Sequence, residues 1–372
     1  MDTVVEFKAV SKQYGKLPVL EDIDLAVKQD DFMVIYGLPS SGKTVLLRLL
    51  MGLEFPDAGD IILRGENVRH MPPKVRNIGY VPQDFALIPH KTIFENIAYP
   101  LRLIKKSTLE IKPVVQRAAS MLSIEELLDK LPTQLSGGQK QRVAVARGIV
   151  KETDIYLFDD PLAGLDFKLR ERLIDDLRQL QDEIAACFIY ATSDPIESLT
   201  LAASIAVLHD RTIGETGEPR SIYLDPRHLS TMDILGFPRA NLFDGHLTKN
   251  QSKLHCKTDL FEFPVLIDAG LPTMKDPLAV TVAVRPEKIQ IVSDIDVNFL
   301  TADIYLREDL GAEEIIYLNV QDCSLTMVNP SSQNGHYDVG DQINIRIDAA
   351  SFFIFEKDTG NRVGKGINNF NA

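Results

Sequence analysis

The stretch that most constrains the fold is a glycine-rich loop between two apolar runs. Phe32–Tyr36 is apolar and stops at a glycine, as a buried strand does, and Val45–Leu50 is apolar except for Arg48, as in a buried helix. Residues 37–44 between them read Gly-Leu-Pro-Ser-Ser-Gly-Lys-Thr, which is a glycine, four residues and Gly-Lys-Thr. The order of strand, loop and helix predicts a P-loop, whose backbone amides bind nucleotide phosphates. A chance match on a surface turn is the alternative, and the flanking runs argue against it.

A second apolar run ends in two adjacent carboxylates. Ile155–Asp159 is typical of a buried strand, and Asp160 follows it directly. In a P-loop protein such an aspartate holds Mg²⁺, directly or through water, and the cation offsets the repulsion of a second carboxylate. With Lys43 on the β- and γ-phosphates and the Thr44 hydroxyl on Mg²⁺, Asp159 completes a predicted site for ATP and Mg²⁺. A hydrogen-bonded turn with two solvated aspartates is the alternative.

The length and charge of the chain narrow the classes of protein. Its 372 residues exceed one ordinary core and predict two domains, or three. A formal net charge of −13 disfavours nucleic acid and anionic lipid as direct partners. No apolar run reaches the ~18 residues that span a bilayer, and the N-terminus lacks a basic stretch followed by an apolar one. We therefore expect a cytoplasmic chain that reaches a membrane only through partner proteins.

Two regions of different character follow one another. The first ~235 residues alternate strand-like and helix-like segments, which predicts an α/β domain over residues 1–237. Helical signals dominate at about 90–151, where Thr92–Glu95 has the form of a capping box and Val114–Leu128 is amphipathic. This block predicts a helical subdomain inserted in the α/β core.

Residues 238–372 have the pattern of a small all-β domain. Turn residues separate segments that alternate or are β-branched, and helix signals are few. The clearest predicted strands are Ala279–Val284, Thr301–Leu306, Glu314–Val320 and Gln342–Ile347. We place the boundary between the two domains near Gly236–Asn241.

A third motif narrows the kind of P-loop protein. Leu135, Ser136, Gly137, Gly138 and Gln139 form a serine and two glycines at a helix start, which is a second anion site on the same principle. Here the chain resembles the ATP-binding cassette (ABC) family, whose LSGGQ signature it carries intact. The resemblance implies an α/β P-loop NTPase core with a helical ABC subdomain. It also implies that the signature contacts the γ-phosphate held by the other subunit of a head-to-tail dimer. As an isolated string, the segment would be a helix start with a solvated cap.

The resemblance assigns roles to further residues. Tyr14 matches the aromatic residue that stacks on adenine, Gln83 matches the glutamine that senses Mg²⁺ and the attacking water, and Asp166 lies in the D-loop. Residues 84–90 are expected to face the coupling helix of a permease. Taken singly, Tyr14 and Gln83 would also be ordinary surface residues. The ATP-binding set that the resemblance implies is Tyr14, Gly37, Leu38, Pro39, Ser40, Ser41, Gly42, Lys43 and Thr44, with Thr44, Gln83 and Asp159 at Mg²⁺.

The resemblance extends into the β domain. Val284–Ile289 and Asp309–Glu313 resemble the C-terminal regulatory TOBE domain of carbohydrate-import ATPases of the maltose and glycerol type. That likeness implies a small all-β, OB-like C-terminal domain. It covers nearly the whole chain, more strongly to about residue 235 than beyond.

Three departures from the family fall at one composite site. Asp160 stands where active members have glutamate, so its carboxylate is one methylene shorter, and Ser193 stands where they have a histidine. A misplacement of about 1 Å can cost on the order of 10²-fold in rate, within the ~10²–10⁴-fold expected of a general base. In the P-loop, Pro39 lacks an N–H and Ser40 occupies a glycine position. We expect the chain's own site to bind ATP and hydrolyse it poorly.

These observations predict the energy-coupling ATPase subunit of a bacterial importer for a sugar, polyol or similar small polar solute. Expected partners are a second, competent ATPase subunit, two integral-membrane permease subunits and, indirectly, a periplasmic or extracellular solute-binding protein. We expect the chain to lie peripherally on the cytoplasmic face of the inner membrane. Alternatives are a homodimer that hydrolyses slowly with Asp160, a non-hydrolysing regulatory subunit, and a soluble cassette protein of repair or translation.

Overall fold

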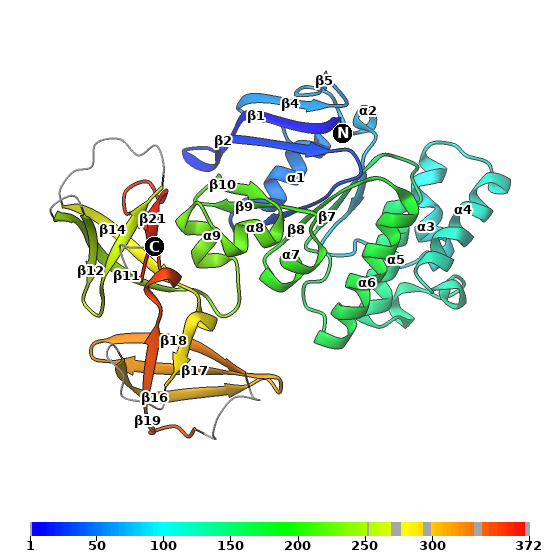
Figure 1. Ribbon diagram of the computed structural model, residues 1–372. Coiled ribbons are helices and arrows are strands. Elements are labelled where there is room, and N and C mark those ends of the chain that lie inside the picture. The colour runs from blue at the N-terminus through cyan, green and yellow to red at the C-terminus, as the bar shows by residue number, and fades with distance from the viewer. Residues whose placement is uncertain (1, 251–252, 269–276, 293–298, 331–336, 369–372) are drawn as a thin grey trace. The chain divides into compact units, whose positions relative to one another are not determined.

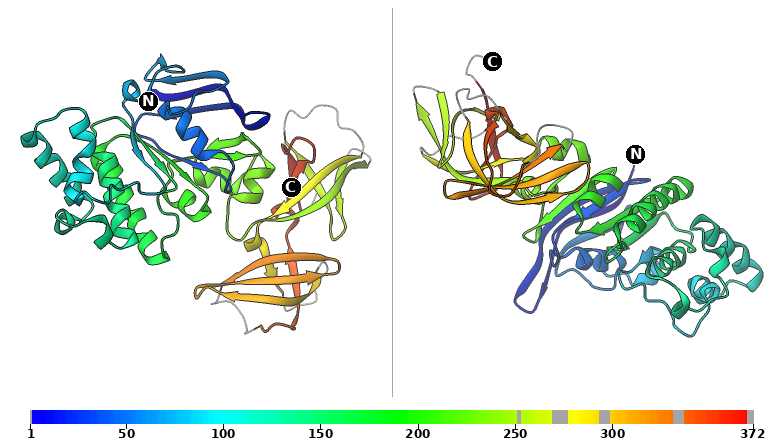
Figure 2. Two further views of the ribbon diagram at one scale, coloured as in Figure 1. Left: turned by 180° about the vertical axis from the view of Figure 1, so that it is seen from behind. Right: turned by 90° about the horizontal axis from the view of Figure 1, so that it is seen from below.

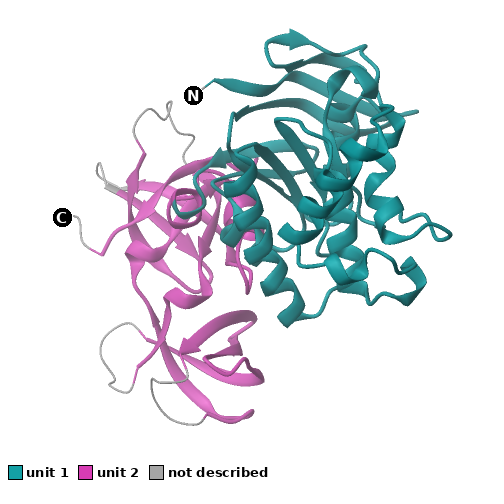
Figure 3. Cartoon of the chain, turned by 90° about the vertical axis from the view of Figure 1, so that its right-hand side faces the viewer, with its two compact units in different colours: residues 1–220 teal, residues 221–372 magenta. Residues whose placement is uncertain are grey.

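The computed structural model describes residues 2–250, 253–268, 277–292, 299–330 and 337–368. Its contacts divide the chain into two compact units, residues 1–220 and 221–372 (Figure 3). The change of character predicted near Gly236–Asn241 coincides with the start of the first strand of the β region, and the division by contacts falls earlier, within helix α8 (Pro219–Leu224). The predicted α/β core, helical subdomain and all-β C-terminal region are all present.

A six-stranded sheet forms the centre of unit 1 (Figure 1). Its order is β10-β9-β3-β8-β7-β6, in which all neighbours are parallel except the edge pair β10 and β9. The two predicted strands, Phe32–Tyr36 and Ile155–Asp159, are β3 and β7, and every residue of both is buried. The other strands are β6 (Gly79–Val81), β8 (Cys187–Thr192), β9 (Ser204–His209) and β10 (Thr212–Gly217).

A second, antiparallel sheet shares a core with the first. Its order is β2-β1-β4-β5, from β1 (Thr3–Tyr14), β2 (Leu17–Lys28), β4 (Ala58–Leu63) and β5 (Glu66–Asn67). Helix α1 (Lys43–Met51) contributes Leu46, Leu47, Leu49 and Leu50 to one apolar cluster with residues of both sheets. Burial of these side chains fixes the helix that follows the glycine-rich loop.

The helical subdomain consists of α3 (Ile93–Leu103), α4 (Thr108–Met121) and α5 (Gly137–Ile149), which lie together beside the sheet (Figures 1 and 2). The predicted capping box at Thr92 is confirmed, because the Thr92 side chain accepts from the Glu95 N–H and Glu95 accepts in return. The prediction of an amphipathic helix over Val114–Leu128 is wrong at both ends. A capping box at Ser107 starts α4 earlier, and a short 3₁₀ turn at Glu125–Leu127 follows after the helix has ended.

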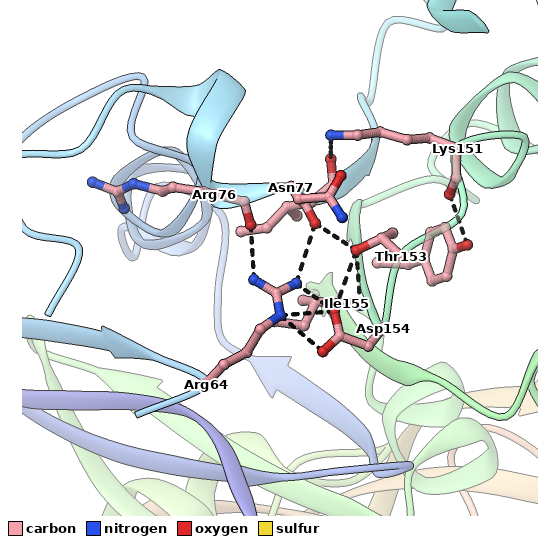
Figure 4. A network of polar contacts seen from close by, with 9 residues as sticks. Arg64, Arg76, Asn77, Lys151, Thr153, Asp154 and Ile155 are labelled. Atoms are coloured by element: carbon pink, nitrogen blue, oxygen red, sulfur yellow. Dashed lines mark hydrogen bonds and ion pairs between the residues drawn. The ribbon is translucent and has the colours of Figure 1, made fainter. Parts of the chain in front are cut away.

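A polar network fixes the start of β7 (Figure 4). Arg64, in the turn between β4 and β5, donates from Nε to Asp154 Oδ2 at 2.8 Å and from Nη1 to the Arg76 carbonyl at 2.9 Å. Arg76 ends the short helix α2 (Pro73–Arg76), just before β6. Beside them, the Tyr156 hydroxyl donates to the Lys151 carbonyl at 2.9 Å. The network holds β7 where it emerges from the helical subdomain.

Unit 2 contains a closed barrel and a five-stranded sheet. The barrel order is β11-β12-β13-β21-β20-β14, and the sheet order is β15-β19-β16-β17-β18. All four strands predicted after residue 238 are present, as β14, β16, β17 and β19. The bounds are β11 (Asn241–Asn250), β12 (Lys253–Thr258), β13 (Glu262–Ile267), β14 (Leu278–Val284), β15 (Ile289–Ile291), β16 (Leu300–Asp309), β17 (Glu313–Val320), β18 (Cys323–Pro330), β19 (Gln342–Ile347), β20 (Phe353–Glu356) and β21 (Arg362–Gly366).

Arg285 joins the helical start of unit 2 to its barrel. Arg285 is 3 % exposed, and its guanidinium lies 4.0 Å over the Tyr223 ring and donates from Nη1 to the Leu235 carbonyl. Helix α9 (Leu229–Ile234) lies between Tyr223 and Leu235 in the sequence. Its Met232 packs with Ala283 and Phe355 of the barrel. The segment after residue 220 therefore belongs with the barrel.

Among the described residues, no helix is both long enough and apolar enough to cross a membrane.

Candidate nucleotide-binding site

The glycine-rich loop runs from the end of β3 to the start of α1, as predicted. A Cβ on Gly37 would lie 2.4 Å from the Leu208 carbonyl oxygen, so only glycine fits there. Ser40 has a φ of +66°, which confirms that it adopts the left-handed conformation expected at a glycine position. A serine in this conformation costs about 1 kcal/mol relative to glycine. The loop therefore keeps its course despite the loss of the glycine.

Side chains of the loop meet the carboxylate at the end of β7. The Lys43 Nζ donates to the Gly37 and Leu38 carbonyls at 2.7 and 2.9 Å, which holds the ammonium over the loop. The Thr44 hydroxyl donates to Asp159 Oδ1 at 2.9 Å, although 115 positions separate the two residues. The parallel sheet and α1 thus bring two of the three predicted Mg²⁺ ligands, Thr44 and Asp159, into direct contact.

The residues present fit ATP with Mg²⁺. Asp159 is 3 % exposed, and its carboxylate beside the Thr44 hydroxyl is a set of oxygen ligands that suits Mg²⁺. The Ser41 hydroxyl is buried with no hydrogen-bond partner among the described residues, as suits a group that meets a phosphate oxygen. When bound, Mg²⁺ neutralises charge on the phosphates.

One cavity of about 410 Å³ collects most of the predicted site residues. Gln83, Asp160 and Ser193 reach it from three separate segments, so the two departures outside the P-loop, Asp160 and Ser193, face the same space as the loop. Asp160 has a φ of +45°, and its N–H donates to the Ala191 carbonyl at 2.8 Å. The cavity is lined by Val19, Pro39, Ser40, Ser41, Gly42, Lys43, Thr44, Val45, Gln83, Asp159, Asp160 and Ser193.

Burial shifts the protonation of the charged groups in this cavity. It raises the pKa of Asp159 and the pKa of Asp160, and the charge of Lys43 partly opposes both shifts. Burial also lowers the pKa of Lys43, against the attraction of the two carboxylates. Burial thus disfavours the charged form of each of the three groups, and the attraction between Lys43 and the two carboxylates opposes this effect.

The predicted residues that do not line this cavity are Tyr14, Gly37, Leu38, Asp166 and Leu135–Gln139. Tyr14 is 47 % exposed, and its hydroxyl donates to Glu54. Asp166 caps α6 (Phe167–Ile184) by accepting from the Leu169 N–H at 3.1 Å. In the signature, Ser136 Oγ accepts from the Gln139 N–H at 3.4 Å, and Ser136 is exposed. A helix start that is capped and open to solvent can receive an anion from another molecule.

The predicted permease-facing segment is held by two helices of the subdomain. Phe85 and Ala86 both have positive φ, and Arg147 of α5 donates to their carbonyls at 2.5 and 2.6 Å. Asn96 of α3 is fully buried and bonds to both the N–H and the carbonyl of Ile88. These contacts fix the backbone that follows Gln83.

Sequence reasoning missed a buried cluster behind Ser193. Directly after Ser193, Asp194 caps α7 (Pro195–Leu201). Glu197, in the first turn of α7, is 2 % exposed and accepts from the Tyr190 and Thr192 hydroxyls at 2.8 and 2.7 Å. Burial raises the pKa of Glu197 to about 7. The two donors lie at alternate positions of β8, and this spacing is the signal that the sequence offered.

Arg170 connects this cluster to the D-loop. Its Nη1 lies 2.5 Å from Asp194 Oδ2, its Nε lies 3.6 Å from Glu197 Oε1, and its Nη2 donates to the Leu165 carbonyl at 3.3 Å.

Sequence reasoning also missed Tyr80 of β6. Its hydroxyl donates to Asp159 Oδ2 at 3.1 Å.

Comparisons with known proteins agree with this geometry. A model described as ABC transporter matches residues 20–163, and a model of the TOBE domain matches residues 282–355. The spermidine/putrescine import ATP-binding protein PotA of Haemophilus influenzae (strain 86-028NP) is 38 % identical over 295 residues, which are 79 % of this chain and 78 % of PotA. The trehalose/maltose import ATP-binding protein MalK of Thermococcus litoralis is 33 % identical over 371 residues, covering 95 % of this chain and 98 % of MalK.

Solved structures extend the likeness to the fold of unit 1. An ATP-binding cassette solved as a dimer in a post-hydrolysis state with ADP and Pi has a TM-score of 0.53 and 28 % identity. The match covers 58 % of this chain and 99 % of that one. With the P-loop, the Asp159 site, the intact signature and the C-terminal barrel, these likenesses identify the chain as a member of the ABC family of import ATP-binding proteins that carry a TOBE domain.

Proposed function

We propose that this chain is the energy-coupling subunit of an ABC importer for a small polar solute, and that it is one half of an asymmetric ATPase pair. Its own site binds ATP with Mg²⁺ and hydrolyses it poorly. Its signature, Ser136–Gln139, completes a competent site on a second ATPase chain that has glutamate and histidine at the positions of Asp160 and Ser193. ATP binding closes the pair, closure moves the permease, and hydrolysis resets it.

The observation that carries this proposal is that one cavity is lined by the P-loop, Asp159, Asp160 and Ser193, whereas the signature lies outside it. A shortened carboxylate and a missing imidazole therefore affect the site of this chain. The signature keeps its capped helix start, so the site that it serves on a partner has no corresponding defect.

The class of solute rests on the relatives. PotA is named for the import of the polyamines spermidine and putrescine, and MalK for the import of the disaccharides trehalose and maltose. Both proteins align with most of this chain. We therefore widen the expected sugar or polyol to small polar solutes that include polyamines. The permease and the solute-binding protein set the solute, since no part of the described ATPase geometry selects it.

In this proposal, residues 1–237 handle the nucleotide and residues 238–372 form a regulatory domain. The chain lies peripherally on the cytoplasmic face of the inner membrane, held by two permease subunits. The segment after Gln83, fixed by Arg147 and Asn96, is the surface that the permease contacts.

The test is the native mass of the transporter, purified through a tag on this chain, with every subunit identified. We expect one copy of this chain, one different ATPase chain with glutamate and histidine at the two positions, and two permease subunits. Two copies of this chain and no other ATPase would overturn the asymmetric pair. Absence of any permease would overturn the importer itself.

A further inference from the structure

Tyr80 belongs to none of the three motifs, yet its hydroxyl contacts the carboxylate that they place at Mg²⁺. The Tyr80 hydroxyl lies 3.1 Å from Asp159 Oδ2, and the Thr44 hydroxyl lies 2.9 Å from Asp159 Oδ1. Each oxygen of this buried carboxylate thus has one hydroxyl donor. Because the two donors come from segments far apart in the sequence, the orientation of the carboxylate depends on both.

The register of the sheet places Tyr80 behind the site. Strand β6 pairs in parallel with β7, with Tyr80 opposite Leu157, so Tyr80, Leu157 and Asp159 point to the same face of the sheet. The Tyr80 ring packs against the core cluster that contains Leu157 and the leucines of α1. Among the described residues, those that line the nucleotide cavity include Thr44 and Asp159 but not Tyr80. Tyr80 therefore holds Asp159 from outside the cavity. The other carboxylate oxygen, Oδ1, bonds to Thr44, which lines the cavity.

We propose that Tyr80 is a positioning residue for Mg²⁺, whose hydroxyl holds the Asp159 carboxylate so that Oδ1 is presented to the Mg²⁺ that accompanies ATP. A donor on the far oxygen fixes the plane of the carboxylate, and outer hydrogen-bond partners of metal ligands commonly contribute about 10- to 100-fold to metal affinity. Two residues after β6 ends, the chain reaches Gln83, which lines the cavity. Strand β6 therefore supports both Asp159, through Tyr80, and Gln83. The inference rests on the binding of ATP with Mg²⁺ by this chain.

The test is the Mg²⁺ dependence of nucleotide binding by the full chain, measured by titrating a fluorescent ATP analogue at increasing Mg²⁺. In Tyr80→Phe we expect the Mg²⁺ concentration for half-maximal effect to rise about tenfold. We expect the affinity for the analogue in EDTA to stay within about twofold of wild type, because the cavity lining is unchanged and the phenylalanine ring keeps its packing. Binding in EDTA separates the metal from the nucleotide, which a measurement of hydrolysis alone would not do.

The matched control is Tyr156→Phe. The Tyr156 hydroxyl donates to the Lys151 carbonyl at 2.9 Å from the other end of β7, so this variant loses a comparable bond of the same strand. We expect its Mg²⁺ dependence to match that of wild type. An unchanged Mg²⁺ dependence in Tyr80→Phe, an equal change in both variants, or an equal loss of binding in EDTA would each overturn the role of Tyr80. Failure of the wild-type chain to bind the analogue would overturn the nucleotide site, and this role with it.

Discussion

Asp160 combines an unusual backbone conformation with a partly buried carboxyl group. Its φ of +45° lies in the left-handed region, where aspartate is more common than most other residues with a side chain. Burial raises its pKa, while Lys43 acts in the opposite direction. Aspartate thus adopts this backbone conformation at little cost, although its side chain is one methylene shorter than that of glutamate and reaches less far into the cavity.

Restoring both family residues is the direct test of the degenerate site. We expect Asp160→Glu combined with Ser193→His to raise ATP hydrolysis at this chain's own site by about tenfold or more, because both side chains line its nucleotide cavity. Hydrolysis is measured in the assembled transporter, with the catalytic glutamate of the second ATPase chain replaced by glutamine so that only this site turns over. Asp160→Asn is the control: if Asp160 serves no base function, its turnover stays at the wild-type rate. Unchanged turnover in the double variant would contradict the view that these two residues limit hydrolysis.

Glu197 should make stability depend on pH. Burial raises its pKa from 4.5 to about 7, so the folded chain holds this proton over a range in which the unfolded chain has lost it. Stability therefore falls as the pH rises from about 4.5 to about 7, by about 3 kcal/mol in all, and is level above. Glu197→Gln has no such proton. We expect the difference in unfolding free energy between wild type and Glu197→Gln to change across this range in urea titrations, and a constant difference would refute it.

At the scale of elements, α5 starts with the signature and carries Arg147 in its last turn. The first turn is capped within the chain, whereas Arg147 holds the Phe85 and Ala86 carbonyls. The Phe85–Ala86 segment follows Gln83, which lines the nucleotide cavity. One helix thus connects the signature segment with the loop beside the nucleotide cavity.

Substitutions at two capping serines, Ser107 and Ser136, can distinguish a loss of helix stability from a loss of signature function. In α4, Ser107 Oγ accepts from the Glu110 N–H at 3.4 Å, as Ser136 Oγ does from the Gln139 N–H in α5. We expect Ser136→Ala and Ser107→Ala each to cost about 1 kcal/mol in urea unfolding and to leave ATP binding by the isolated chain unchanged. In the assembled transporter, only Ser136→Ala should lower turnover, by about tenfold or more. An equal turnover in both variants would argue against a signature that acts on a partner's ATP.

At the scale of the whole molecule, each unit has its own core. The α/β core of unit 1 groups the two sheets around α1, and the barrel and sheet of unit 2 share a separate apolar cluster. Helix α9 packs on the barrel through Met232, and Arg285 holds this helical segment by bonds to backbone carbonyls. The guanidinium of Arg285 is therefore central to the integrity of unit 2.

Removing this guanidinium should loosen unit 2. We expect Arg285→Ala to lower the stability of the barrel by about 3 kcal/mol, because it leaves buried carbonyls unpaired and a cavity beside Tyr223. The control is Arg346→Ala, whose side chain is 47 % exposed and lies 3.7 Å from Asp348, and which should change stability by less than about 0.5 kcal/mol. Hydrogen exchange of the β14 and α9 amides in the full chain measures both. Equal protection in the two variants would exclude this role for Arg285.

The sequence by itself determined the segments whose conformation depends on neighbours in the chain. The P-loop, the strand that ends at Asp159, the capping box at Thr92 and the β region after residue 238 were all predicted from contiguous residues. That Ser40 occupies a glycine position was expected from the resemblance to the family, and its positive φ agrees with this. Local sterics and short hydrogen bonds suffice for these features.

Only the tertiary structure decided which side chains meet. Tyr80 reaches Asp159 across 79 positions because β6 pairs with β7 in one register, and a shift of that register by one residue would turn the tyrosine to the other face. The Glu197 side chain is buried because the hydroxyls of Tyr190 and Thr192, on the preceding strand β8, donate hydrogen bonds to its carboxyl group. Arg285 joined the segment after residue 220 to the barrel, which placed the division between the units ahead of the predicted boundary. Such contacts depend on how separately formed segments pack, which no single stretch of the sequence specifies.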